Sequence, residues 1–138
     1  MAVDGADDLR EAMTKLNAIS QRLRDLARSG GAGWKKEYVA ARRDLQNQLV
    51  IVDRCGTACF KGIASDLVAE FRATLSRFRH LLSLHQAEWP VVCIAPEDPE
   101  YRRSMLGVGE GQEALIRVAG QVMRMCAEKE SLKQEFDE

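Results

Sequence analysis

The sequence predicts an all-α protein, built as an antiparallel up-down-up-down four-helix bundle. Apolar residues recur at steps of three and four along four long segments, the periodicity of amphipathic helices. The prolines Pro90, Pro96 and Pro99 all fall in one short stretch, which marks a single long connection. With 46% hydrophobic and 30% charged residues in 138, the composition is typical of one folded domain. We assign 1–129 to this domain and 130–138 to a polar, frayed tail.

The first two helices are expected over 4–28 and 34–53. The apolar seam of the first is Leu9, Met13, Leu16, Ile19, Leu23 and Leu26, and that of the second is Trp34, Tyr38, Ala41, Leu45, Leu49 and Val52. Three glycines within 29–33 end the first helix. Gly56 is a natural stop for the second, and Thr57 is a natural N-cap for the helix that follows.

The third helix is expected over 58–87, and its broad apolar stripe makes it the predicted central element. Trp89-Pro90 ends it, because proline disfavours helical geometry in the residue before it. Residues 88–98 then form an extended, Pro-containing crossover. Asp98-Pro99 is a strong start signal for a fourth helix over 99–129. Three alternate glycines leave open whether that helix is continuous or splits after residue 106: Gly107, Gly109 and Gly111.

The lengths of the connections predict which residues meet. The first two connections are short, which makes neighbouring helices antiparallel. A crossover of about ten residues is too short to travel along a helix of about 45 Å and turn at both ends. One end of the bundle therefore collects the aromatic residues and a histidine: Trp34, Tyr38, His85, Trp89 and Tyr101. The opposite end collects three thiols, those of Cys55, Cys59 and Cys126.

The aromatic end has two interpretations. Large aromatic side chains can cap a bundle, with His85 as a satisfied residue near the core. Alternatively, the same five residues line a small-molecule pocket beneath the crossover, with His85 as its titratable group. Whether this end is hollow or filled discriminates between the two.

The thiol end is interpreted as buried structural cysteines. Three thiolates could ligate zinc or copper, but Cys55 and Cys59 are separated by three residues rather than the two of common zinc knuckles. No histidine is expected nearby, so we predict no metal and no cofactor. The acidic N-terminus lacks the pattern of a secretory signal. The thiols are therefore expected to be reduced, in a cytoplasmic protein.

Several functional classes are disfavoured. The net charge of −1 argues against nucleic-acid binding, and no apolar run is long enough to span a membrane. The glycines lack the context of a phosphate loop. Histidine phosphotransfer through His80 is a further, less favoured hypothesis, because the lysine-glycine pair usual after such a histidine is missing.

The sequence favours a non-catalytic helical protein-interaction module of adaptor, regulatory or chaperone-like type, with no catalytic residue assigned. Its partner is unknown and includes a second copy of the chain. Apolar residues that lie off the main seams motivate a homodimer: Val39, Val50, Ile51, Ile116, Met123 and Met125. The alternative is a small-ligand binder or enzyme that uses the aromatic end.

Overall fold

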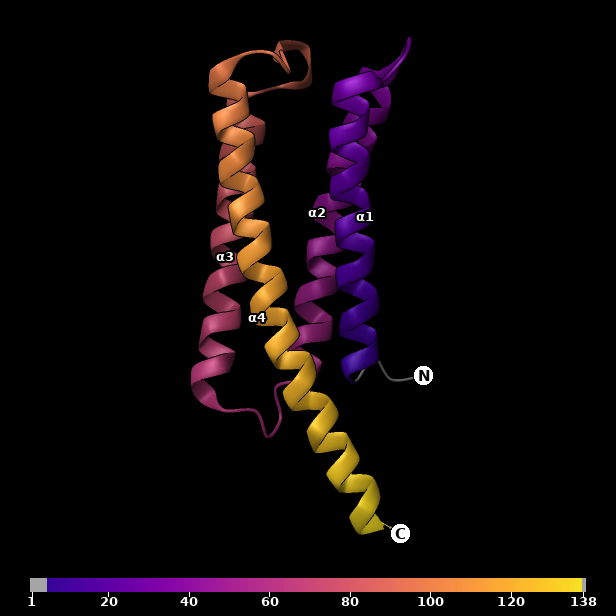
Figure 1. Cartoon of the computed structure of the whole chain (residues 1–138), viewed down its shortest axis with the longest axis vertical. Coiled ribbons are helices and arrows are strands. Elements are labelled where there is room, and N and C mark those ends of the chain that lie inside the picture. Colours follow the sequence, from indigo (N-terminus) through magenta and orange to yellow (C-terminus); the bar gives the residue numbers. More distant parts are fainter. Residues whose placement is uncertain (1–4, 138) are drawn as a thin grey trace.

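The computed structural model describes residues 5–137 and consists of four long helices (Figure 1). These are α1 (Ala6–Ser29), α2 (Trp34–Ala58), α3 (Ser65–Glu88) and α4 (Pro99–Asp137), with a short 3₁₀ turn, η1 (Val91–Cys93), between the last two. Successive helices run in opposite directions, and no strand occurs within the described residues. The predicted fold class is confirmed. Asp4, the predicted start of the first helix, lies outside the described residues.

The core forms along the predicted apolar seams. Side chains with almost no exposed surface come from all four helices: Leu9, Leu16, Leu45, Leu49, Phe71, Phe78, Leu115 and Val122. Each alternates with exposed polar residues at helical spacing, so burial of one face drives the packing of each helix. Within the described part of the chain, no helix combines the length and the apolarity needed to cross a bilayer.

The backbones approach most closely within two hairpins, α1–α2 and α3–α4, and the hairpins meet most closely along α1 and α4. The prediction that the third helix is central is therefore wrong, because α1 and α4 each pack closely on two helices, whereas the close helical neighbour of α3 is α4. The apolar stripe of α3 is also less buried than its width suggests, since Leu84 is 50% exposed. Contacts between α3 and α2 are made by side chains, such as the 3.3 Å hydrogen bond from Gln46 to Gln86.

The corner between α2 and α3 differs from the prediction. Gly56 does not end α2, which continues to Ala58, and Thr57 lies within the helix rather than capping the next one. A Cβ on Gly56 would lie only 2.5 Å from the ring of Phe71, so the glycine allows α3 to pack closely. The turn instead uses Gly62, whose φ of 81° suits glycine.

The glycines of the fourth helix do not break it. α4 is continuous over 39 residues. A Cβ at Gly107 or Gly109 would meet no neighbour, whereas Gly111 lies against Phe78 and Leu81 of α3. Packing of α4 on both α1 and α3 supplies the stability that each glycine removes.

The predicted helix end at residue 129 is also wrong, because α4 continues to Asp137. Figure 1 shows its C-terminal part projecting past the other three helices. Glu130, Lys133 and Gln134 in this part are exposed, and glutamate, lysine and glutamine are good helix formers. Intrinsic helix propensity therefore accounts for the continuation beyond the bundle.

The crossover closes one end of the bundle. It is extended at Pro90 and Ile94, as expected, but its middle tightens into η1, which lies against α2. Ile94 is buried and joins the core, whereas Val92 and Cys93 are exposed. Asp98 accepts a hydrogen bond of 2.8 Å from the backbone N–H of Glu100, which confirms the start of α4 at Pro99.

Candidate functional site

A cavity of about 510 Å³ lies between the two hairpins, towards the aromatic end. All four helices line it, and much of its wall is apolar: Leu23, Leu45, Leu82, Met105 and Val108. This volume lies in the range typical of small-molecule sites. No residue of the 88–98 crossover lines it, so the cavity lies deeper in the bundle than the predicted pocket.

The five aromatic-end residues come together, but only three of them line the cavity. Tyr38, His85 and Tyr101 are 2%, 4% and 4% exposed and face it. The two tryptophans stand behind this layer and are half-buried. Trp34 packs edge-on against Tyr38 at 5.7 Å between ring centroids, and Trp89 packs edge-on against Tyr101 at 5.3 Å. The tryptophans therefore support the tyrosines rather than forming the wall.

The two tyrosines join the hairpins at this end of the cavity. Their hydroxyl oxygens are 3.3 Å apart, a buried hydrogen bond between α2 and α4. Burial, with Tyr38 beside it, raises the pKa of Tyr101 above its usual range. The Tyr101 hydroxyl is therefore a neutral hydrogen-bonding group.

His85 is held as a neutral side chain. Burial, together with the nearby charge of Arg42, lowers its pKa to about 4. Nδ1 lies 2.6 Å from the hydroxyl of Ser104. When Ser104 donates to Nδ1, Nε2 carries the proton and becomes a donor. Within the described residues, Nε2 is buried and has no hydrogen-bond partner.

Unpaired polar atoms are concentrated around this cavity. Among the described residues, four buried side-chain nitrogen or oxygen atoms have no partner in the protein: Ser20 Oγ, Arg42 Nη2, His85 Nε2 and Gln86 Nε2. All four residues line the cavity. Leaving such an atom unpaired costs about 1–3 kcal/mol, so each calls for an explanation.

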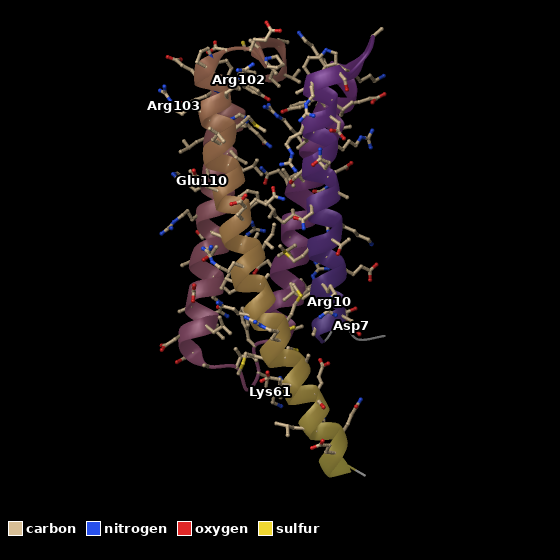
Figure 2. All side chains as sticks on the ribbon, in the orientation of Figure 1. Asp7, Arg10, Lys61, Arg102, Arg103 and Glu110 are labelled. Carbon is tan, nitrogen blue, oxygen red and sulfur yellow. The ribbon has the colours of Figure 1, made fainter. Side chains whose placement is uncertain are left out.

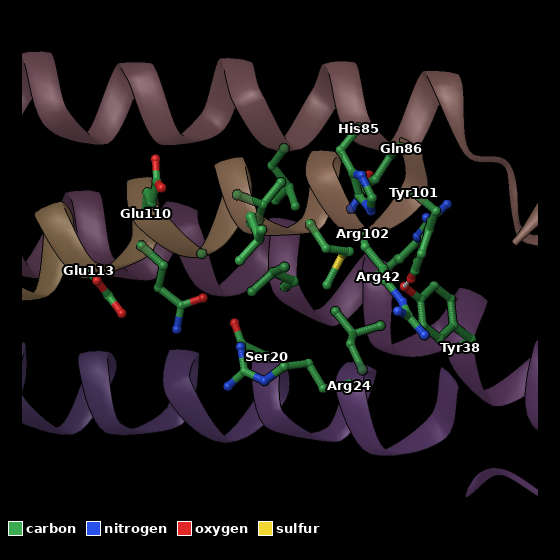
Figure 3. A pocket seen from close by; sticks show the side chains of 18 residues that line it. Ser20, Arg24, Tyr38, Arg42, His85, Gln86, Tyr101, Arg102, Glu110 and Glu113 are labelled. Atoms are coloured by element: carbon green, nitrogen blue, oxygen red, sulfur yellow. Dashed lines mark hydrogen bonds between the residues drawn. The ribbon is translucent and has the colours of Figure 1, made fainter. Parts of the chain in front are cut away.

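The mouth of the cavity lies between α1 and α4. The exposed lining residues all belong to these two helices, and the charged ones are Arg24, Arg102, Glu110 and Glu113. Figure 2 shows Arg102 near the crossover end of α4 and Glu110 further along the same helix. In Figure 3, Arg42, Arg102 and His85 gather at the end with the tyrosines, and the two glutamates lie at the opposite end. Arg42 and Arg102 therefore make the tyrosine end the more positive one, and Arg24 of α1 lies between the two ends.

Sequence reasoning missed the polar residues of the wall. The inward position of Ser20 could have been predicted, because Ser20 lies between Leu16 and Leu23 on the apolar seam of α1. Arg42 is one turn after Tyr38 on α2, but a long side chain at the edge of a seam can point outwards or inwards. Gln86 directly follows His85 and carried no signal.

The three thiols of the opposite end also come together. Cys59 and Cys126 lie close enough for each to affect the pKa of the other, and the charge of Cys59 also raises the pKa of Cys55. Burial raises the pKa of each thiol, that of Cys126 to about 12. No group of three or more histidine, cysteine, aspartate or glutamate side chains within the described residues is arranged to hold a metal ion.

His80 lies apart from both ends of the bundle. It is exposed on α3, and the neighbouring Arg79 forms a 3.9 Å ion pair with Asp53 of α2. Arg79, the basic residue directly before His80, is therefore engaged within the bundle. Phosphotransfer through His80 stays an untested hypothesis.

Comparison of the chain with protein-family models, with curated proteins and with solved structures yields no match.

Proposed function

We propose that this protein binds a small molecule in the interhelical cavity formed by α1–α4. The observation that carries the proposal is the coincidence of two features at one place. The cavity is large enough for a small molecule, and the four described residues that carry an unpaired buried polar atom all line it. Small-molecule binding is the alternative function that the sequence left open. The proposed site differs in position, because the cavity lies within the bundle and not beneath the crossover.

The surroundings support the same proposal. Small-molecule sites are mostly apolar and carry a few polar groups that orient the ligand. Here leucine, valine and methionine side chains supply the apolar wall, and Arg42, His85 and Gln86 are the polar lining residues that carry unpaired nitrogen atoms. A bundle filled only for stability would place apolar side chains at these positions, because unpaired buried donors destabilise it.

The proposal is tested with N-phenyl-1-naphthylamine, a neutral probe whose fluorescence rises in apolar surroundings. We expect saturable binding of one probe per chain. Gly109→Leu should abolish it, because Gly109 lines the cavity and a side chain there meets no neighbouring atom. Gly107→Leu is the matched control, since Gly107 has equal free space but does not line the cavity.

Both variants replace glycine by a better helix former, so neither is expected to unfold the protein. The proposal fails if the wild type shows no saturable binding. It also fails if Gly109→Leu and Gly107→Leu bind the probe equally well.

A protein-interaction role, the function that the sequence favours, is our second proposal. It is supported by five apolar side chains that are each at least 40% exposed, Val39, Val50 and Ile51 on α2 and Ile116 and Met125 on α4. Met123 packs against the core instead. We rank this role second because α2 and α4 are not among the closely packed pairs, so these residues form no single patch.

The self-association form of this role is a homodimer. Light scattering at high protein concentration should then give twice the chain mass, and Val50→Glu should restore the monomer. A monomeric mass in the wild type at all concentrations contradicts it. We also propose a cytoplasmic location, supported by four free cysteines.

A further inference from the structure

We infer that the interhelical cavity selects a monocarboxylate with an apolar body, the carboxylate at Arg42 and the apolar part between the leucine side chains. This inference rests on the proposed function and specifies the class of its ligand. Three unpaired atoms and the polarity of the cavity carry it.

The first step concerns the inward polar atoms at the tyrosine end. Arg42 Nη2 and Gln86 Nε2 can only donate hydrogen bonds. Gln86 already uses its Oε1 to accept from Gln46 at 3.3 Å. His85 Nε2 donates when Ser104 donates to Nδ1. Arg42 and Gln86, with His85 in this tautomer, therefore carry donors without an acceptor in the protein, which favours a ligand group rich in acceptors such as an ionised carboxylate.

The second step concerns charge. Arg42 is half-buried, and it takes part in no ion pair among the described residues. Its guanidinium carbon lies 4.9 Å from the ring centroid of Tyr38, so one face of the guanidinium is held against the ring. Its edge is left to form a charge-assisted pair with a planar carboxylate.

The third step concerns whether the ligand carries one negative charge or two. Among the described cavity-lining residues with an unpaired donor, Arg42 is the cation, and His85 is neutral. A monoanion is therefore neutralised at this end, whereas a phosphate dianion keeps an uncompensated charge in a partly desolvated site. Glu110 and Glu113 at the opposite end repel a second anionic group on the ligand.

The fourth step concerns the body of the ligand. Away from the tyrosine end, Leu23, Leu45 and Val108 contribute apolar surface to the wall. A ligand whose carboxylate pairs with Arg42 places its remaining atoms along these side chains. An apolar body is favoured there, because burying apolar surface stabilises binding by about 25 cal/mol per Å².

The test compares four ligands of one shape, measured by displacement of N-phenyl-1-naphthylamine: 2-naphthoate, 2-naphthamide, 2-naphthylmethylamine and 2-naphthyl phosphate. We expect the wild type to bind 2-naphthoate at least about tenfold more tightly than the neutral amide, the ratio given by one charge-assisted hydrogen bond. The amine and the phosphate should bind more weakly than 2-naphthoate. This comparison needs no variant.

Arg42→Gln should reduce the affinity for 2-naphthoate to that for the amide while the neutral probe still binds. Arg103→Gln is the matched control, because Arg103 is exposed on the same helix as Arg102 but does not line the cavity. It should change the ratio less than about threefold, as expected of a screened surface charge.

The outcomes separate the two proposals. Equal affinity for naphthoate and naphthamide, with the neutral probe bound, overturns the carboxylate inference and leaves the small-molecule function standing. Preference for the phosphate or the amine also overturns the inference. Absence of probe binding to the wild type overturns the proposed function and this inference with it.

Discussion

Acidification should destabilise this protein through His85 before most carboxylates titrate. In the unfolded chain the imidazole takes up a proton near its ordinary pKa of 6.5, whereas in the folded bundle burial and the charge of Arg42 lower the pKa to about 4. Between these values the unfolded state binds more protons, so the free energy of unfolding falls as the pH falls.

The size of the effect follows from the two pKa values. One pKa unit corresponds to about 1.4 kcal/mol. The free energy of unfolding is therefore lower than at neutral pH by about 2 kcal/mol at pH 5 and by about 3 kcal/mol at pH 4. His85 is 4% exposed, so solvent screening removes little of this. Such a loss is a large fraction of the stability of a typical domain.

The assay is urea denaturation of three proteins at pH 7, 6 and 5: the wild type, His85→Gln and His80→Gln. The wild type and His80→Gln should both lose about 2 kcal/mol of unfolding free energy over this range, because the exposed His80 lies apart from His85 and its replacement leaves the buried imidazole in place. His85→Gln removes the titrating group and should lose much less. Equal pH dependence of His85→Gln and the wild type would refute the reasoning.

Three further predictions concern glycine packing, an unpaired hydroxyl and thiol exposure. Gly120→Ala should raise the free energy of unfolding by up to about 1 kcal/mol, since its Cβ meets no neighbour. Gly56→Ala should lower it by about 1–3 kcal/mol, because its Cβ would lie 2.5 Å from the Phe71 ring. Urea denaturation measures both, and a stabilised Gly56→Ala contradicts the packing. Ser20→Ala should raise the free energy of unfolding by about 1 kcal/mol, since it removes a buried hydroxyl that has no partner in the protein. A fall of more than about 1 kcal/mol would contradict the unpaired state of this hydroxyl. Ellman's reagent should react quickly with only one thiol of the native protein, the exposed Cys93, and with all four after unfolding; a second fast thiol would show that the thiol end is open.

The fold could be predicted because burial follows a simple period. Leu9, Leu49 and Leu115 stand on seams visible in the sequence, and the structure buries each of them completely. Local stop signals were less reliable. Gly56 was predicted to end a helix, yet its missing side chain serves close contact with Phe71. A glycine has both uses, and only the neighbouring helix decides between them.

The site could be predicted in part. Connection lengths placed Tyr38, His85 and Tyr101 at one end, and these three residues face the cavity. The cavity itself could not be predicted, because its volume is what remains after side chains from four helices have packed. The inward direction of Arg42 was equally hidden, since the same side chain at the edge of a seam can extend into solvent.

The pairing of buried amides shows where this bundle gives up stability. Gln48, between α1 and α2, donates to the backbone carbonyl of Ala12 at 2.9 Å, and Gln112 donates to Asn17 at 3.0 Å. Buried polar side chains that join helices therefore find partners. The described residues with unpaired buried atoms line the cavity, and one of them is the cationic Arg42. Apolar residues at those positions would give a more stable bundle, so their polar character favours a binding role over a structural one.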